Sequence, residues 1–188
     1  MTLFFFQPHP PLRLDDWKKE QIVMGSSKAP VEIILFEDLL CEECQNFTLH
    51  ILPLIIKEFI DTGLARLIYA PIAILDHPEK AIGTCYCLFR QDPKKTLIFL
   101  ERFFQDPDNM LPVDAVLENN FEYDRLSFKK CFENFDPEPY LKKNLAAAES
   151  LISTDLELPL LFIQGEKIEN KSYFEMKRLI QSHLQSSP

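Results

Sequence analysis

The chain has 188 residues, of which 46% are hydrophobic and 26% charged, and its formal net charge is −9. This length and composition predict a single globular domain over 1–188 with a sizeable core. The negative charge disfavours nucleic acid and anionic membrane surfaces as partners. No apolar run approaches the roughly 20 residues that cross a bilayer, so we expect no membrane insertion.

The N-terminal part of the chain predicts little regular structure. Residues 1–6 are apolar, but no basic region precedes them and no small-residue cleavage site follows, so we expect no intact signal peptide there. Residues 7–11 hold three of the fourteen prolines and predict an extended lead-in. Residues 14–24 favour a weak helix, and 25–30 favour a turn.

Two cysteines three residues apart, Cys41 and Cys44, follow the apolar, β-branched run 31–36. That run predicts a strand covered on both faces. Apolar residues then recur at helical spacing, so the sequence predicts a strand that feeds a Cys-x-x-Cys at the start of a helix. The helix N-terminus carries partial positive charge and unpaired N–H groups, which stabilise a thiolate on the first cysteine. This pattern is typical of a dithiol redox site.

A Cys-x-x-Cys can also be half of a tetrahedral zinc site. A structural zinc site would need a second Cys or His pair at similar spacing. Cys85 and Cys87 are only two residues apart, and no histidine lies within four residues of either. A buried cysteine pair without chemistry is the third interpretation. The sequence favours redox chemistry over both.

The remaining elements follow in chain order. Pro53 should kink the helix after the cysteines, and Gly63 should cap its end. Residues 65–70 predict a second strand, parallel to the first because a helix joins them. The stretch 76–152 is helical in pattern, with breaks at the Asp-Pro steps 92–93, 106–107 and 136–137. Residues 158–163 predict a third strand, 164–165 a hairpin turn to a short fourth strand near 167–168, and 172–184 a closing helix.

Three further cysteines remain. Cys85 and Cys87 lie at i and i+2 of a predicted helix and face apart, so they should not bond to each other. Cys85 shares a face with apolar residues and is expected to be a small core side chain. Cys87 and Cys131 could be buried, exposed or paired with each other.

Several motifs resemble the DsbA-like branch of the thioredoxin superfamily, the thiol–disulfide oxidoreductases. They are the turn and strand start 25–31, the active-site segment 36–44 with an acid three residues before the first cysteine, the Leu-Pro step 52–53, the helix end 58–63 and the segment 159–165. The resemblance implies an α/β thioredoxin fold with an inserted helical subdomain. It divides the chain into a thioredoxin part, 14–75 and 150–188, and a helical insertion, 76–149.

The resemblance also assigns roles. Cys41 would attack and be attacked, and Cys44 would resolve the mixed disulfide. Pro159 would be cis beside the dithiol, with Leu158 presenting its backbone to an extended substrate; from the residues alone, Pro159 could be an ordinary strand-entry proline. The resemblance implies protein substrates with disulfides or thiols, an unidentified redox partner and a periplasmic or otherwise extracytoplasmic location. No cofactor or metal is expected, because the two sulfurs carry the electrons.

Two positions depart from the family pattern. Glu42 and Glu43 stand between the cysteines, where a strong oxidant of the family typically has Pro-His. Two carboxylates should oppose the thiolate, so we predict a reducing or isomerising member. Leu35 stands six residues before Cys41, where many relatives carry a buried acid that moves protons. Glu37 or bulk water would have to replace that acid.

Two other functions remain open at this point. A thioredoxin-fold metal-binding module could use Cys41 and Cys44 as soft ligands for copper or zinc. A non-catalytic protein could bind peptides in the groove beside Pro159.

Overall fold

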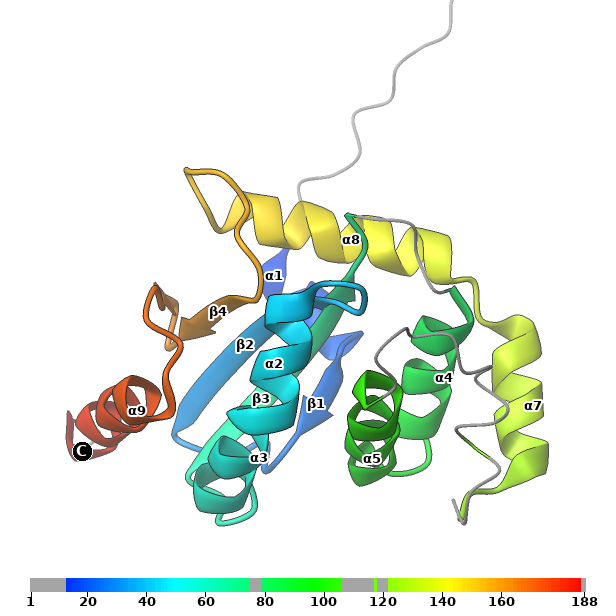
Figure 1. Ribbon diagram of the computed structural model, residues 1–188, viewed down its shortest axis with the longest axis horizontal. Coiled ribbons are helices and arrows are strands. Elements are labelled where there is room, and N and C mark those ends of the chain that lie inside the picture. Colours follow the sequence, from blue (N-terminus) through cyan, green and yellow to red (C-terminus); the bar gives the residue numbers. More distant parts are fainter. Residues whose placement is uncertain (1–12, 75–78, 106–116, 118–121, 187–188) are drawn as a thin grey trace, which may run out of the picture.

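A computed structural model of the protein describes residues 13–74, 79–105, 117 and 122–186 (Figure 1). The strands are β1 (Ile22–Met24), β2 (Val31–Asp38), β3 (Ala65–Ile72), β4 (Leu160–Ile163) and β5 (Glu166–Lys167). The helices are α1 (Leu14–Lys19), α2 (Glu42–His50), α3 (Leu52–Ile55), the π-helix η1 (Ile56–Ile60), α4 (Glu79–Phe89), α5 (Pro93–Phe104), α7 (Arg125–Asn134), α8 (Pro137–Ser150) and α9 (Tyr173–Ser186).

The five strands form one sheet in the order β1-β3-β2-β4-β5. β2 and β3 are parallel, as predicted, and the other pairs are antiparallel. The predicted weak helix over 14–24 is wrong in its second half, because Ile22–Met24 pairs with β3. Three residues are too few for an alternating pattern to show in the sequence. The hairpin at Gln164 and Gly165 is confirmed; both φ angles are positive, as a type I′ turn requires.

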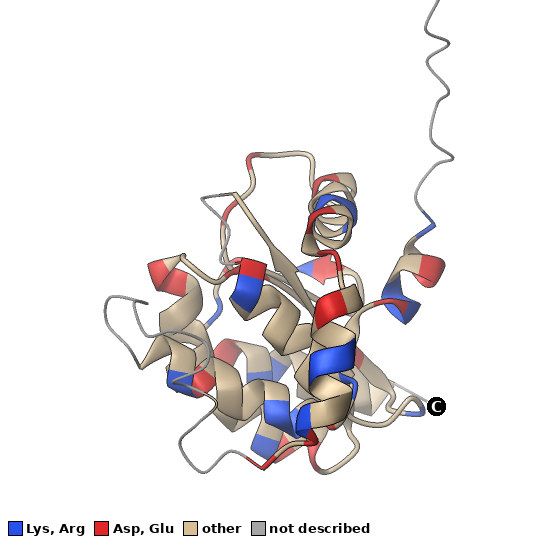
Figure 2. Ribbon diagram, turned by 90° about the vertical axis from the view of Figure 1, so that its right-hand side faces the viewer, with Lys and Arg blue, Asp and Glu red and all other residues tan. Residues whose placement is uncertain are grey.

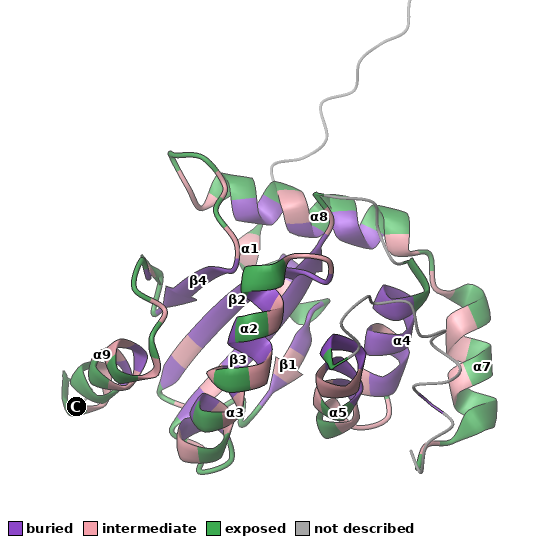
Figure 3. Ribbon diagram, in the orientation of Figure 1, coloured by how far each residue is buried: buried purple, intermediate pink, exposed green. Residues whose placement is uncertain are grey.

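Helices cover both faces of the sheet, which explains why the central strands are apolar along their whole length (Figure 3). Ile33 and Leu35 join the larger core, which α2, α3, α4, α5 and α9 complete. Ile34 and Phe36 face the other way, into a smaller core with Trp17 of α1 and the alanines of α8. Successive residues of one strand thus bury opposite faces.

The helix after the cysteines is broken where the sequence predicts it. Helix α2 ends at His50, and α3 begins at Leu52 with Pro53 in its first turn. Proline has no backbone N–H, so it disrupts the middle of a helix but is tolerated at the start. The broken segment keeps one apolar face on the sheet, and Phe47, Ile55 and Phe59 are all buried.

Four described helices, α4, α5, α7 and α8, lie between β3 and β4 in the chain (Figure 1). The Asp-Pro steps at 92–93 and 136–137 start α5 and α8, because each aspartate caps the helix and each proline takes its first position. The step at 106–107 lies outside the described residues. A sheet with helices on both faces and a helical block between β3 and β4 confirms the predicted fold class.

A disulfide joins Cys87 of α4 to Cys131 of α7, with 5.7 Å between the Cα atoms. The sequence left this pairing open. Helix α7 buries none of its residues fully, so the disulfide is one of the main ties that hold it to α4. A second contact between the two helices is the packing of the Phe132 ring of α7 against Gly83 of α4. The ring lies so close that a Cβ added at Gly83 would be 3.1 Å from it. Cys85, by contrast, is a free thiol in the core, as predicted.

Replacing Cys87 and Cys131 together by alanine is expected to lower the free energy of unfolding by about 2–4 kcal/mol, because the unfolded chain gains the freedom of an opened loop. The disulfide closes a sequence separation of 44 residues. Urea unfolding of the variant and of the intact protein measures the difference. Unfolding midpoints that coincide would show that α7 is held without this disulfide.

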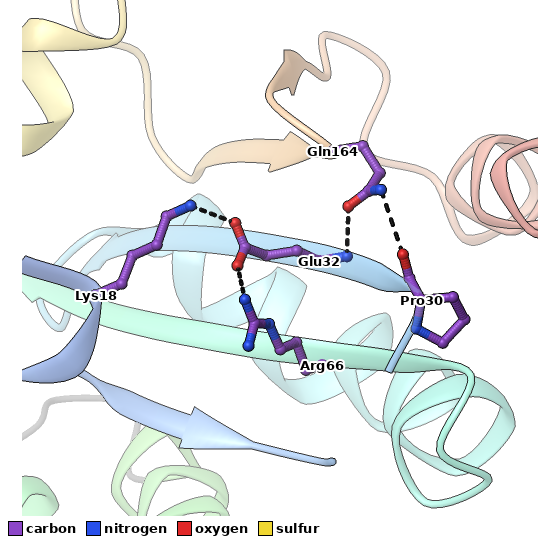
Figure 4. Close-up of polar contacts among 5 residues, drawn as sticks. All are labelled: Lys18, Pro30, Glu32, Arg66 and Gln164. Atoms are coloured by element: carbon purple, nitrogen blue, oxygen red, sulfur yellow. Dashed lines mark hydrogen bonds and ion pairs between the residues drawn. The ribbon is translucent and has the colours of Figure 1, made fainter. Parts of the chain in front are cut away.

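Polar contacts fix the ends of the strands far from the cysteines (Figure 4). The Glu32 carboxylate lies between the Lys18 amine at 2.6 Å and the Arg66 guanidinium at 2.5 Å. The side-chain amide of Gln164 accepts from the Glu32 backbone N–H at 2.8 Å and donates to the Pro30 carbonyl at 3.3 Å. The contacts join α1, β2 and β3 to the β4–β5 hairpin and so hold the register of the sheet.

Candidate active site

Three chain segments meet at one end of the sheet. β2 and β3 end side by side there, since Asp38 pairs with Ile72. β4 runs antiparallel to β2 and begins at this same end, since Leu160 pairs with Phe36. The two cysteines, residues 73–74 after β3 and the Leu158–Pro159 step that precedes β4 therefore gather at this end. Figure 1 shows α2 beginning at this end of β2.

Cys41 is the N-cap of α2, and Cys44 lies in the first turn. The Cys44 backbone N–H donates to Cys41 Sγ at 3.4 Å. Cys41 is partly exposed, whereas Cys44 is fully buried, and both are free thiols. A sulfur that caps a helix receives N–H donors and the positive end of the helix dipole, both of which favour its thiolate. This geometry suits an accessible nucleophile with a shielded partner one turn away.

Glu43 acts on the same sulfur in the opposite sense. Its Oε2 lies 3.6 Å from Cys41 Sγ, so the thiol donates to the carboxylate. A hydrogen bond from the neutral thiol, and the repulsion between two negative groups after ionisation, both disfavour the thiolate. Glu42 is also exposed and lies in the positive first turn of α2. The helix terminus and these acids therefore compete for control of Cys41.

Asp38 holds the active-site loop in place. Its Oδ1 accepts from the Leu40 N–H at 2.9 Å, and its Oδ2 accepts from the Ile74 N–H at 2.8 Å. Its backbone carbonyl accepts from the Cys41 N–H at 3.1 Å. One buried carboxylate thus ties the cysteine loop to the loop after β3. The sequence gives only a weak signal for this, an acid three residues before the first cysteine.

Glu37 is fully buried on the α2 side of β2, two residues beyond Leu35. The Thr48 hydroxyl of α2 lies 2.9 and 2.8 Å from its two oxygens. Burial raises the pKa of Glu37 to about 8, although the Thr48 hydroxyl and that of Tyr69 act to lower it. Alternate residues of a strand share a face, so Glu37 lies on the same face as Leu35, two residues further along β2. It replaces the buried acid that many relatives carry at position 35. No signal in the sequence singles out Thr48, because it reaches Glu37 only through the packing of α2 on β2.

The Glu37 carboxyl group influences the ionisation of Cys44 electrostatically. Burial raises the pKa of the Cys44 thiol most, and the negative charge of Glu37 raises it further. Cys44 will therefore not ionise unaided at neutral pH. A group that accepts its proton must lie nearby, and Glu37 titrates in the right range to do so.

The Leu158–Pro159 peptide bond is cis, as the resemblance implies. Pro159 is buried, and Leu158 is half-buried and packs against the smaller core. The roles of Leu158 and Pro159 toward a substrate stay predictions.

The two segments that form this end of the sheet are acidic. Neither 29–56 nor 144–166 contains a lysine or arginine. Elsewhere basic and acidic positions are mixed, as on α7, α8 and α9. Figure 2 shows blue and red positions interspersed on the helices of the side that faces the viewer. Among the described residues, no group of three His, Cys, Asp or Glu side chains could hold a metal ion. No helix in the described part of the chain is long and apolar enough to cross a membrane.

A capping cysteine, a buried cysteine one turn later and a cis-proline at the same end of the sheet define a dithiol protein of thioredoxin fold. The sequence model of the thioredoxin family matches residues 18–182. The chain belongs to the thioredoxin family and is a DsbA-like thiol–disulfide oxidoreductase.

Individual relatives agree with this placement. A probable disulfide bond formation protein D of Bacillus cereus is 23% identical over 171 residues, which cover 86% of this chain and 77% of that protein. Disulfide bond formation protein D of Bacillus subtilis is 30% identical over 94 residues, which cover 48% of this chain and 41% of the relative.

Solved structures show the same fold. Chlamydia trachomatis DsbA superposes with a TM-score of 0.75 at 23% identity, covering 96% of this chain and 99% of that one. Oxidised BdbD from Bacillus subtilis gives 0.70 at 21% identity, covering 89% of this chain and 94% of that one.

Proposed function

We propose that this oxidoreductase uses Cys41 and Cys44 to reduce or isomerise disulfides in polypeptide substrates. The observation that carries the direction is the Glu43 carboxylate 3.6 Å from Cys41 Sγ. A dithiol is a strong oxidant when its reduced form is stabilised, chiefly by a thiolate that forms easily. Glu43 stabilises the protonated thiol instead, and Glu42 adds a second negative charge beside it.

In the first step, the Cys41 thiolate attacks one sulfur of a substrate disulfide. A bond forms between Cys41 Sγ and that sulfur, and the other substrate sulfur leaves as a thiolate that takes up a proton. Leu158 and Pro159 would border the extended substrate at this end of the sheet. The partly exposed Cys41 is open to such an attack, whereas the buried Cys44 is not.

In the second step, Cys44 gives its proton to the Glu37 carboxylate and attacks Cys41 Sγ. The Cys41–Cys44 disulfide forms, and the remaining substrate sulfur leaves. Two electrons have then passed to the substrate. In isomerisation the freed substrate thiolate attacks elsewhere before Cys44 does, so the dithiol is recovered without net electron transfer.

A redox partner must return the Cys41–Cys44 disulfide to the dithiol, and we propose that this happens outside the cytoplasm. The Cys87–Cys131 disulfide supports that location, because structural disulfides persist in oxidising compartments.

Single cysteine variants test this function. Cys44→Ser is expected to accumulate a mixed disulfide with a disulfide-bonded protein substrate, because the step that resolves the mixed disulfide and releases the substrate needs Cys44. Cys41→Ser is expected to be inert in insulin reduction and to form no such adduct. Mass spectrometry of the trapped species reads out both, with Cys85→Ala as a control that should keep activity. Adducts found mainly on Cys44 of the intact protein would reverse the two roles, and insulin reduction that survives Cys41→Ser would exclude the mechanism.

A further inference from the structure

The hydroxyl of Tyr69 is buried and has no partner at ordinary hydrogen-bond distance among the described residues, but it lies near enough to Glu37 to lower the pKa of that carboxyl. Tyr69 is fully buried on β3 and belongs to the larger core. A buried hydroxyl left unpaired costs free energy, so it calls for a reason. Two other buried side-chain atoms of the described chain share this condition, the Tyr140 hydroxyl and the Gln21 Oε1.

The register of the sheet places Tyr69 beside the buried carboxyl group. Leu35 of β2 pairs with Tyr69, and Glu37 pairs with Pro71. Alternate residues of a strand share a face, so Tyr69 and Glu37 lie on the α2 face as diagonal neighbours. Diagonal neighbours on one face of a sheet lie about 7–8 Å apart, within reach of an aromatic side chain. Leu35, which pairs with Tyr69, supplies no polar group, and the Tyr69 hydroxyl acts on the Glu37 carboxyl by lowering its pKa.

The groups around Glu37 leave one of its two carboxylate oxygens free to accept a further hydrogen bond. Thr48 of α2 has a single hydroxyl proton, so it can donate to only one carboxylate oxygen at a time. The other titratable groups that face this pair are Cys44 of α2, Cys85 of α4 and Tyr140 of α8. All are thiols or phenols whose pKa burial raises, so none brings a positive charge to an ionised Glu37.

We propose that Tyr69 is a positioning residue of the resolving step, whose hydroxyl donates a hydrogen bond to the Glu37 carboxylate and releases it when Glu37 is protonated. The proposal rests on the proposed function, in which Glu37 takes the Cys44 proton. In the ionised state, Thr48 and Tyr69 together serve both oxygens and keep the base available near neutral pH.

The test is a pair of conservative variants, Tyr69→Phe and Tyr140→Phe. Each removes one buried hydroxyl of the larger core and adds no atom, so packing and folding are retained in both. The measured quantity is the rate at which Cys44 resolves a preformed Cys41 mixed disulfide, followed from pH 5 to pH 10. A lost hydrogen bond to a charged group should slow Tyr69→Phe roughly tenfold at neutral pH. The rate should recover at higher pH, where Glu37 ionises without help, and Tyr140→Phe should follow the intact protein.

A second readout observes Glu37 directly. Infrared titration of the buried carboxyl band should show that Glu37 ionises at higher pH in Tyr69→Phe than in Tyr140→Phe. In a Glu37→Gln background, Tyr69→Phe should have no further effect on the resolving rate. A rate that falls equally at every pH, or a carboxyl titration that does not move, would overturn the role of Tyr69. If the intact protein resolves no mixed disulfide at all, the proposed function fails, and the infrared titration still decides whether Tyr69 acts on Glu37.

Discussion

Titration against glutathione is expected to place the Cys41–Cys44 pair nearer thioredoxin's roughly −270 mV than DsbA's roughly −120 mV. The contact of Glu43 with Cys41 Sγ and the carboxylate of Glu42 in the same first turn disfavour a negative charge on that sulfur. The first turn of α2 favours it. The interval between the two potentials is about 7 kcal/mol for two electrons, so the measurement separates the alternatives clearly. A potential above about −160 mV would refute the electrostatic argument.

Substitutions between the cysteines test the cause. Replacing Glu42 and Glu43 by Pro and His should raise the potential, because two negative charges are lost and a histidine can stabilise the thiolate. The single changes Glu43→Gln and Glu42→Gln form a matched pair: both lose one exposed carboxylate of the first turn, but Glu43 is the one hydrogen-bonded to Cys41. Glu43→Gln should therefore raise the potential more. Equal shifts would mean that net charge matters and the hydrogen bond does not.

Much of the fold follows from local signals in the sequence. The run 31–36 predicts a buried strand, and the structure extends it to Asp38. The Asp-Pro steps predict breaks that become helix starts, because aspartate caps and proline fits the first turn. Strand β1 escapes prediction because its three residues are defined by pairing with β3, which is a non-local contact.

The candidate site shows the same division. The spacing of Cys41 and Cys44 after a strand indicates where the chemistry lies, because helix N-termini stabilise thiolates. The pairing of Cys87 with Cys131 cannot be derived from spacing, since it depends on how α4 and α7 pack. Thr48 reaches Glu37 only because α2 lies over β2, so its function is invisible in the sequence alone.

Replacing Glu37 by glutamine is expected to stabilise the folded protein while it slows the resolving step. The pKa of Glu37 is about 8 in the folded protein, against an ordinary value of 4.5. Between those values the folded protein keeps a proton that the unfolded chain releases, so the free energy of unfolding falls as pH rises. The fall is about 1.4 kcal/mol per pH unit, and it reaches roughly 5 kcal/mol above pH 8. Glutamine stays neutral and can still accept from Thr48, so it escapes this cost.

The variant should therefore match the intact protein near pH 4.5 and exceed it by about 3 kcal/mol at pH 7. Urea unfolding of both proteins in the dithiol form, repeated across this range, gives the difference in free energy at each pH. Glu42→Gln is the control, because its exposed carboxylate is solvated in the folded and unfolded states and should give no such divergence. The resolving rate of Glu37→Gln should drop by about 100-fold or more at neutral pH, as for loss of a positioned base. Stability curves that run parallel at every pH would show that folding does not raise the pKa of Glu37 and that Glu37 is ionised in the folded protein. Glu37 would then not be an acid that titrates near neutral pH, and Cys44 would have to pass its proton to another group.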